Sequence, residues 1–128
     1  MLLHGQNEAR KWCFGTYCGL DFNNSPPTFI NNIAIPGNSS NLCGPNGNLW
    51  FYTDGISVWN QNNQIMANGN NITNSNTGHN QCAIALKQPG NSNLCYIISS
   101  QAPGGSKYSI VDMSLAAGLG SVTVKSAA

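Results

Sequence analysis

The chain has 128 residues, a formal net charge of +1 and only 7% charged residues, against about 25% in an average soluble domain. Its few basic residues form no patch, which argues against nucleic-acid binding by counter-ion release. No apolar run is long enough for a transmembrane helix, so we expect no membrane insertion. The 20 asparagines and 14 glycines separate short apolar segments, a pattern typical of an all-β protein with many tight turns.

The first part of the chain alternates short apolar segments with loops. Met1–Gln6 is interpreted as a signal-peptide remnant, with a disordered N-terminus as the alternative. From residue 7 to residue 128 we expect a single all-β domain. Its first predicted strands are Lys11–Phe14, Tyr17–Phe22 and an edge segment, Thr28–Ile35. Residues 36–48 are rich in proline, glycine and asparagine and are predicted to be turns throughout.

Residues 49–60 carry the strongest hairpin signal, because Asp54-Gly55 lies between two β-rich runs. A two-residue loop there predicts the cross-strand pairs Thr53/Ile56, Tyr52/Ser57, Phe51/Val58 and Trp50/Trp59. The same register places Trp50, Tyr52 and Trp59 on one face. It places Leu49, Phe51, Ile56 and Val58 on the other. Since neither face is polar, we expect the hairpin to be covered on both sides.

The second half of the chain continues the β pattern, with no helix beyond a single turn within Ser114–Leu119. A long polar loop is expected over residues 67–80. The predicted strands are Gln64–Met66, Gln81–Leu86, Leu94–Ser99, Lys107–Leu115 and Val122–Lys125. Residues 43–52 and 89–97 share a turn, an Asn-Leu pair and an aromatic-containing strand, at an offset of about 45 residues, the period of a four-stranded propeller blade. We therefore expect antiparallel, blade-like repeats, two imperfect and a third partial, in a partial β-propeller or a β-sandwich.

Five cysteines in so short a chain indicate an oxidising compartment, and their odd number leaves at least one free or paired between chains. Cys13 and Cys18 flank a possible tight turn and are the candidate disulfide. The alternative is that the cysteines serve as small buried hydrophobic residues. Because no Cys-x-x-Cys pattern occurs in the sequence, we predict no metal site and no cofactor.

Several motifs together resemble a known group of proteins. Lys11–Gly15 followed by Gly19–Phe22 resembles the Trp-Tyr-Phe-Gly and Gly-Leu-Asp-Phe opening of large secreted surface proteins of Bacteroidota, the gliding-motility-associated, type IX secretion cargo group. Asn46–Gly55 resembles their Asn-Gly-Asn-Leu-Leu-Phe-Tyr-Thr-Asp-Gly motif. The resemblance implies an N-terminal β-propeller-like domain, an extracellular location and a cleaved signal peptide. The chain departs from this pattern at three cysteines, Cys13, Cys82 and Cys95.

The functional expectation is a non-catalytic protein. The acidic residues are few and dispersed, and no recognised catalytic motif surrounds His79. We therefore expect a secreted cell-surface structural or adhesion module that self-associates through strand edges, as in a filament or surface layer. One alternative is a carbohydrate-binding module using the aromatic residues Trp50, Tyr52 and Trp59. The other is a fragment of a larger secreted propeller protein. The expected partners are accordingly other copies of the chain, the remainder of a longer surface protein, or glycans.

Overall fold

The computed structural model describes residues 7–34, 40–73, 83–101 and 104–128. The signal-peptide interpretation of Met1–Gln6 and the predictions about His79 and Cys82 therefore lie outside the described residues. The described chain is all-β, as predicted, and its only helical segments are two single 3-10 turns, η1 and η2. The elements are η1 (Asn7–Ala9), β1 (Lys11–Gly15), β2 (Cys18–Asp21), β3 (Thr28–Phe29), β4 (Ser40–Cys43), β5 (Leu49–Thr53), β6 (Val58–Asn60), β7 (Ala83–Lys87), β8 (Leu94–Gln101), β9 (Gly105–Asp112), η2 (Ala116–Gly118) and β10 (Ser121–Ala127).

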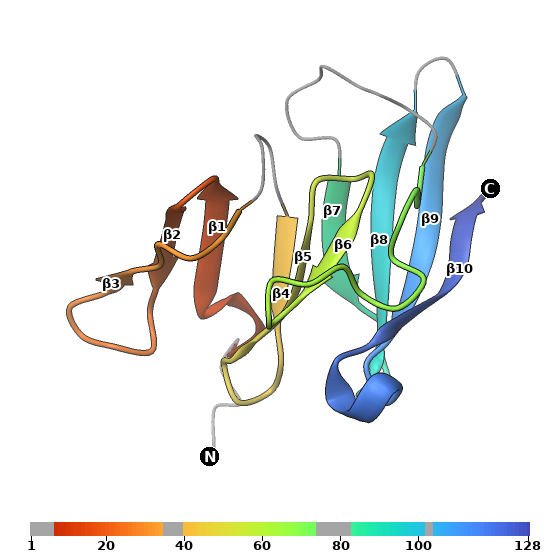
Figure 1. Cartoon of the computed structure of the whole chain (residues 1–128). Helices are drawn as coiled ribbons and strands as arrows, with labels where there is room; N and C mark the ends of the chain where they lie inside the picture. The colour runs from red at the N-terminus through yellow and green to blue at the C-terminus, as the bar shows by residue number, and fades with distance from the viewer. Residues whose placement is uncertain (1–6, 35–39, 74–82, 102–103) are drawn as a thin grey trace.

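The strands form three antiparallel sheets, each made of consecutive strands (Figure 1). Sheet A has the order β1-β2-β3, sheet B the order β4-β5-β6, and sheet C the order β10-β9-β8-β7. Every sheet is thus a simple meander in which neighbours in sequence are neighbours in space. This connectivity is that of blade-like repeats, because short loops join each strand to the next.

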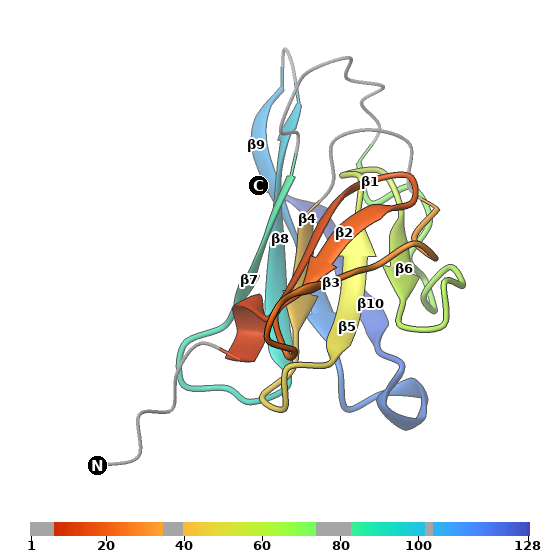
Figure 2. The same cartoon turned by 90° about the vertical axis from the view of Figure 1, so that its left-hand side faces the viewer.

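The three sheets are stacked, with sheet B in the middle. Sheet A lies in front of sheet B in the turned view, and sheet C lies behind it (Figure 2). The neighbouring residues Phe51 and Tyr52 of β5 are both fully buried, and they point into different cores. Phe51 packs with residues of sheet C, whereas Tyr52 packs with Cys13 and Ile33 from the sheet A side. Both faces of the central hairpin are therefore covered, as its apolar sequence requires.

The first strands of the three sheets lie next to one another, because β4 contacts both β1 and β7. Two polar side chains of β4 make the connections. The Asn41 amide accepts a hydrogen bond from the Cys13 backbone N–H at 3.0 Å and donates one to the Lys11 carbonyl at 2.7 Å. On the other side, the Ser40 hydroxyl accepts from the backbone N–H of Ala85 at 2.9 Å. The sequence-based prediction of turns throughout residues 36–48 is wrong for this strand, which is the edge strand of sheet B that contacts both neighbouring sheets.

The predicted register of the central hairpin is also wrong. Tyr52 pairs with Trp59 and Thr53 with Val58, so four residues rather than two form the loop. The cause is Asp54, whose carboxylate accepts hydrogen bonds from the backbone N–H groups of Ile56 and Ser57, both at 2.8 Å. These groups are therefore not available to extend the ladder. Gly55 has a φ of 90°, as a tight turn at this position requires.

A β-bulge changes the predicted faces of β5. Leu42 pairs with Phe51, but the next residue of β4, Cys43, pairs with Leu49, which leaves Trp50 as the extra residue. Trp50 consequently packs against the core shared with sheet C, and Leu49 packs on the Tyr52 side. The predicted common face of Trp50, Tyr52 and Trp59 does not form. Only Tyr52 and Trp59 share a face, with their rings stacked at 5.5 Å.

The predicted Cys13–Cys18 disulfide is wrong. The turn lies at Thr16-Tyr17, one residue later than expected, so Cys13 faces Gly19 and Cys18 faces Gly15. Cys13 is buried, whereas Cys18 is exposed on the opposite face of sheet A. The side chains of two residues on opposite faces of a sheet point apart, and a disulfide cannot join them.

Candidate functional site

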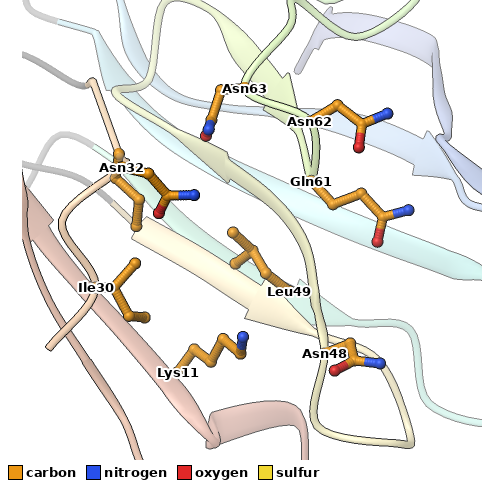
Figure 3. A pocket seen from close by; sticks show the side chains of 9 residues that line it. Lys11, Ile30, Asn32, Asn48, Leu49, Gln61, Asn62 and Asn63 are labelled. Atoms are coloured by element: carbon orange, nitrogen blue, oxygen red, sulfur yellow. The ribbon is translucent and has the colours of Figure 1, made fainter. Parts of the chain in front are cut away.

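A pocket of about 260 Å³ opens between sheets A and B. It is bounded by β1, by the segment after β3, by the start of β5 and by the loop after β6 (Figure 3). Four chain segments that are distant in sequence thus meet at one hollow. Its lining residues are Lys11, Ile30, Asn32, Ile33, Asn48, Leu49, Gln61, Asn62 and Asn63.

Carboxamide side chains dominate the wall of the pocket. The part of the chain that the structure describes offers no hydrogen-bond partner to four of these side chains, Asn32, Asn48, Gln61 and Asn62. The fifth, Asn63, accepts a hydrogen bond from the Tyr52 hydroxyl at 2.9 Å through its Oδ1 atom. Each carboxamide offers two N–H donors and one carbonyl acceptor. The wall therefore presents several donors and acceptors to whatever enters.

The floor of the pocket is apolar and fixed. Ile33 is almost fully buried, and Ile30 and Leu49 pack with it and with Tyr52 in the core between sheets A and B. A surface that combines apolar packing with convergent polar groups is the usual composition of a small-molecule site.

The loop that carries Gln61, Asn62 and Asn63 is held by one buried side chain. The Asn60 carbonyl oxygen Oδ1 accepts hydrogen bonds from the backbone N–H groups of Asn62 at 2.9 Å and Gln64 at 3.2 Å. The Asn60 backbone N–H also donates to the Gln64 carbonyl at 2.8 Å. These bonds preorganise the loop, which lowers the entropy cost of ligand binding.

The charge at the pocket is balanced. The Lys11 ammonium lies 3.1 Å from the carboxylate of Asp21, its cross-strand partner on β2. Partial burial raises the pKa of the Asp21 carboxyl, but hydrogen bonds from Asn23 and Lys11 outweigh this effect and leave that pKa below its ordinary value. Asp21 is therefore ionised at neutral pH and neutralises Lys11.

The aromatic residues predicted as ligand contacts occupy different environments. Tyr52 is 0% exposed, Trp50 packs against the core on the other side of sheet B, and Trp59 is half-buried and stacked on Tyr52. None of the three lines the pocket. Tyr52 supports the pocket from beneath, through its hydrogen bond to Asn63.

The four acidic residues of the chain each make an ion pair or a hydrogen bond. Glu8 pairs with Lys87 at 3.0 Å and Asp21 pairs with Lys11. Asp54 holds the hairpin loop, and Asp112 accepts hydrogen bonds from the backbone N–H and hydroxyl of Ser114. Among the described residues, no three potential metal-binding side chains of the Cys, His, Asp and Glu types come together.

Comparison with family models, with curated proteins and with solved structures finds no match to this chain. Within the described ranges, no helix has both the length and the apolar character to cross a membrane. The function must therefore be argued from the geometry of the protein itself.

Proposed function

We propose that the chain is a non-catalytic structural module that associates head to tail with further copies of itself, through the two end faces of its sheet stack. The location we propose is the cell surface, in keeping with the surface proteins that its motifs resemble. The observation that carries the proposal is the uncovered apolar face of sheet C. The dispersed acidic residues, each engaged in an ion pair or a hydrogen bond, support a role without catalysis.

The outer face of sheet C is apolar over three adjacent strands. The strand register places six large side chains on this face, namely Ile84, Leu86, Tyr96, Ile98, Tyr108 and Ile110. Ile84, Leu86 and Ile98 are each between 41% and 51% exposed. A contiguous apolar surface of this kind usually marks an interaction site.

The internal repeat indicates what covers this face. At the repeat offset of about 45 residues, Phe51 of β5 corresponds to Tyr96 of β8. Phe51 is fully buried because sheet C packs on it, whereas Tyr96 is only partly buried. The equivalent surface of sheet B is thus covered by the next sheet in the stack. A further sheet that packed on sheet C as sheet C packs on sheet B would cover Tyr96 and its neighbours.

Sheet A offers such a surface at the other end of the stack. Its outer face carries Trp12 and Phe14, which are 49% and 52% exposed and contact each other edge to face. The exposed Cys18 lies on the same face, opposite the bulged end of β1. Two different apolar faces at opposite ends generate a heterologous interface, which closes into a ring or continues as a filament.

The edge of sheet C that β10 forms is less suited to association than these faces. β10 forms the outer edge of sheet C, and its pairing with β9 shifts register twice. Ser126 within it has a φ of 48°. Bulges of this kind twist an edge and disfavour pairing with another chain. The geometry of β10 therefore supports association through the end faces rather than through this strand edge.

Light scattering of the native protein tests the proposal. We expect the mass of the wild-type particle to be that of two or more chains, each of 13.6 kDa. The variant Ile98→Lys should reduce it to the monomer, because a charge buried in an apolar interface is strongly unfavourable. The matched control is Ile65→Lys, since Ile65 is 43% exposed against 41% for Ile98 but lies on neither end face. A wild-type monomer at every concentration would overturn self-association and favour a longer surface protein whose own sheets cover the faces.

A further inference from the structure

We propose that the pocket between sheets A and B binds a neutral pyranose sugar. This inference is independent of the proposed self-association, because no pocket residue belongs to the large side chains of either end face.

The hydrogen-bonding groups of the pocket wall match the hydroxyl groups of a polyol. Asn32 comes from the segment after β3, Asn48 from the residue before β5, and Gln61 and Asn62 from the loop after β6, so carboxamides from three chain segments line the pocket (Figure 3). Each carboxamide can donate to one hydroxyl and accept from its neighbour, as vicinal sugar hydroxyls require. Since these side chains have no partner in the described protein, binding would add hydrogen bonds without breaking internal ones.

The size of the pocket limits the ligand to about one ring. Its volume of about 260 Å³ is slightly below the usual range of roughly 300–1,000 Å³ for drug-sized ligands. The apolar floor of Ile30 and Leu49 can contact the C–H face of a pyranose ring. A planar polyaromatic ligand would leave the carboxamides desolvated and unpaired, which is costly.

The charge of the pocket does not favour an anionic sugar over a neutral one. Among the described residues that line the pocket, Lys11 is the only charged one, and Asp21 neutralises it at 3.1 Å. An acidic sugar would have to compete with Asp21 for that ammonium group. The pocket therefore gives a carboxylated sugar no net electrostatic advantage over a neutral one.

The test is an NMR titration of the full chain with the methyl glycosides of glucose, galactose, mannose and N-acetylglucosamine. We expect at least one of them to shift the side-chain NH₂ signals of Asn32 and Gln61, saturating with a Kd on the order of 1 mM. In a variant carrying both Asn32→Ala and Gln61→Ala, the affinity should fall at least about tenfold, since two hydrogen-bonding groups are lost. Dispersed backbone signals in the same spectra show whether the variant is folded.

The matched control is Asn70→Ala, which removes an exposed carboxamide outside the pocket and should leave the affinity unchanged. Methyl glucuronide should bind no more tightly than methyl glucoside. The proposal is overturned if none of the four glycosides shifts the pocket signals. It is equally overturned if the double variant binds as well as the wild type, or if the glucuronide is clearly preferred. Wild-type self-association would be unaffected by any of these results, so the two proposals fail separately.

Discussion

A Phe51→Ala variant is expected to lose about 3–5 kcal/mol of unfolding free energy, the usual cost of truncating a buried phenylalanine. Phe51 is 0% exposed and lies where sheets B and C meet, together with Val58, Ile97 and Val111. Its removal leaves a cavity that the close-packed strands on either side cannot fill without moving. Because a small domain is stable by only about 5–15 kcal/mol, the variant should unfold at a much lower urea concentration.

The control for this prediction is the same substitution at Phe14, which is 52% exposed on the outer face of sheet A. Measured by urea unfolding of dilute protein, Phe14→Ala should cost about 1 kcal/mol or less, as is usual for an exposed site. Equal losses in the two variants would contradict the stacking of sheet C on sheet B.

An Asn41→Ala variant is expected to lose about 2–4 kcal/mol, although the side chain is polar and only partly buried. The Asn41 amide bonds both the Cys13 N–H and the Lys11 carbonyl, and these are shorter links between β4 and β1 than the 4.0 Å hydrogen bond from the Cys43 thiol to the Lys11 carbonyl. Without it, the Cys13 N–H loses this hydrogen bond and the Lys11 carbonyl keeps the longer one from the Cys43 thiol. A backbone group that loses a hydrogen bond while shielded from water costs about 1–3 kcal/mol. Sheet A should then detach more readily than the rest of the stack.

Hydrogen exchange measures the detachment of sheet A directly, because the exchange rate of a backbone amide reports local opening of the structure. In Asn41→Ala, the backbone amides of β1 and β2 should exchange faster, while those of β8 and β9 should change little. The control is Asn70→Ala, whose carboxamide makes no hydrogen bond within the described protein. Uniform acceleration in all three sheets, or none in sheet A, would show that Asn41 does not connect the sheets.

The strands with clear apolar or aromatic patterns could be predicted from the sequence. β1, β8 and β9 lie within a residue or two of their expected positions at one or both ends, and the Leu49–Asn60 segment is a hairpin, as predicted. The repeat at about 45 residues also has a structural counterpart, because Leu49 and Leu94 each begin the second strand of their sheet. These features depend on local patterns, which a sequence displays directly.

The sequence-based predictions failed where a side chain takes the place of a backbone group as a hydrogen-bond partner. Ser40 and Asn41 are typical loop residues, yet in β4 they hydrogen-bond the strands on either side. Asp54 favours a tight turn, yet its carboxylate takes two N–H groups out of the ladder and widens the loop. Such contacts depend on the assembled fold, and a polar residue in the sequence does not reveal which partner it will find.

The pocket could not be predicted for the same reason. Its wall comes from four separate segments, and the aromatic residues expected to bind a sugar are instead used for packing. The abundance of asparagine was the one available signal, but most asparagines in the described chain lie outside the strands and mark no particular site. Only the stacking of sheet A on sheet B brings Asn32, Asn48 and Gln61 around one apolar floor.

Cross-linking between copies tests most directly whether the two end faces meet head to tail. The exposed Cys18 provides a thiol on the outer face of sheet A, and Ile98→Cys places a second on the outer face of sheet C. The test uses a protein in which Cys82 is replaced by serine, so that Cys82 cannot take part in cross-linking. In this protein, mild oxidation of the Ile98→Cys variant should join Cys18 of one copy to the new thiol of the next and produce a ladder of multimers on a non-reducing gel. The variant Ile65→Cys, with a thiol of similar exposure outside both faces, should give no ladder beyond a dimer. The absence of a ladder in Ile98→Cys, or the same ladder in both variants, would contradict the account.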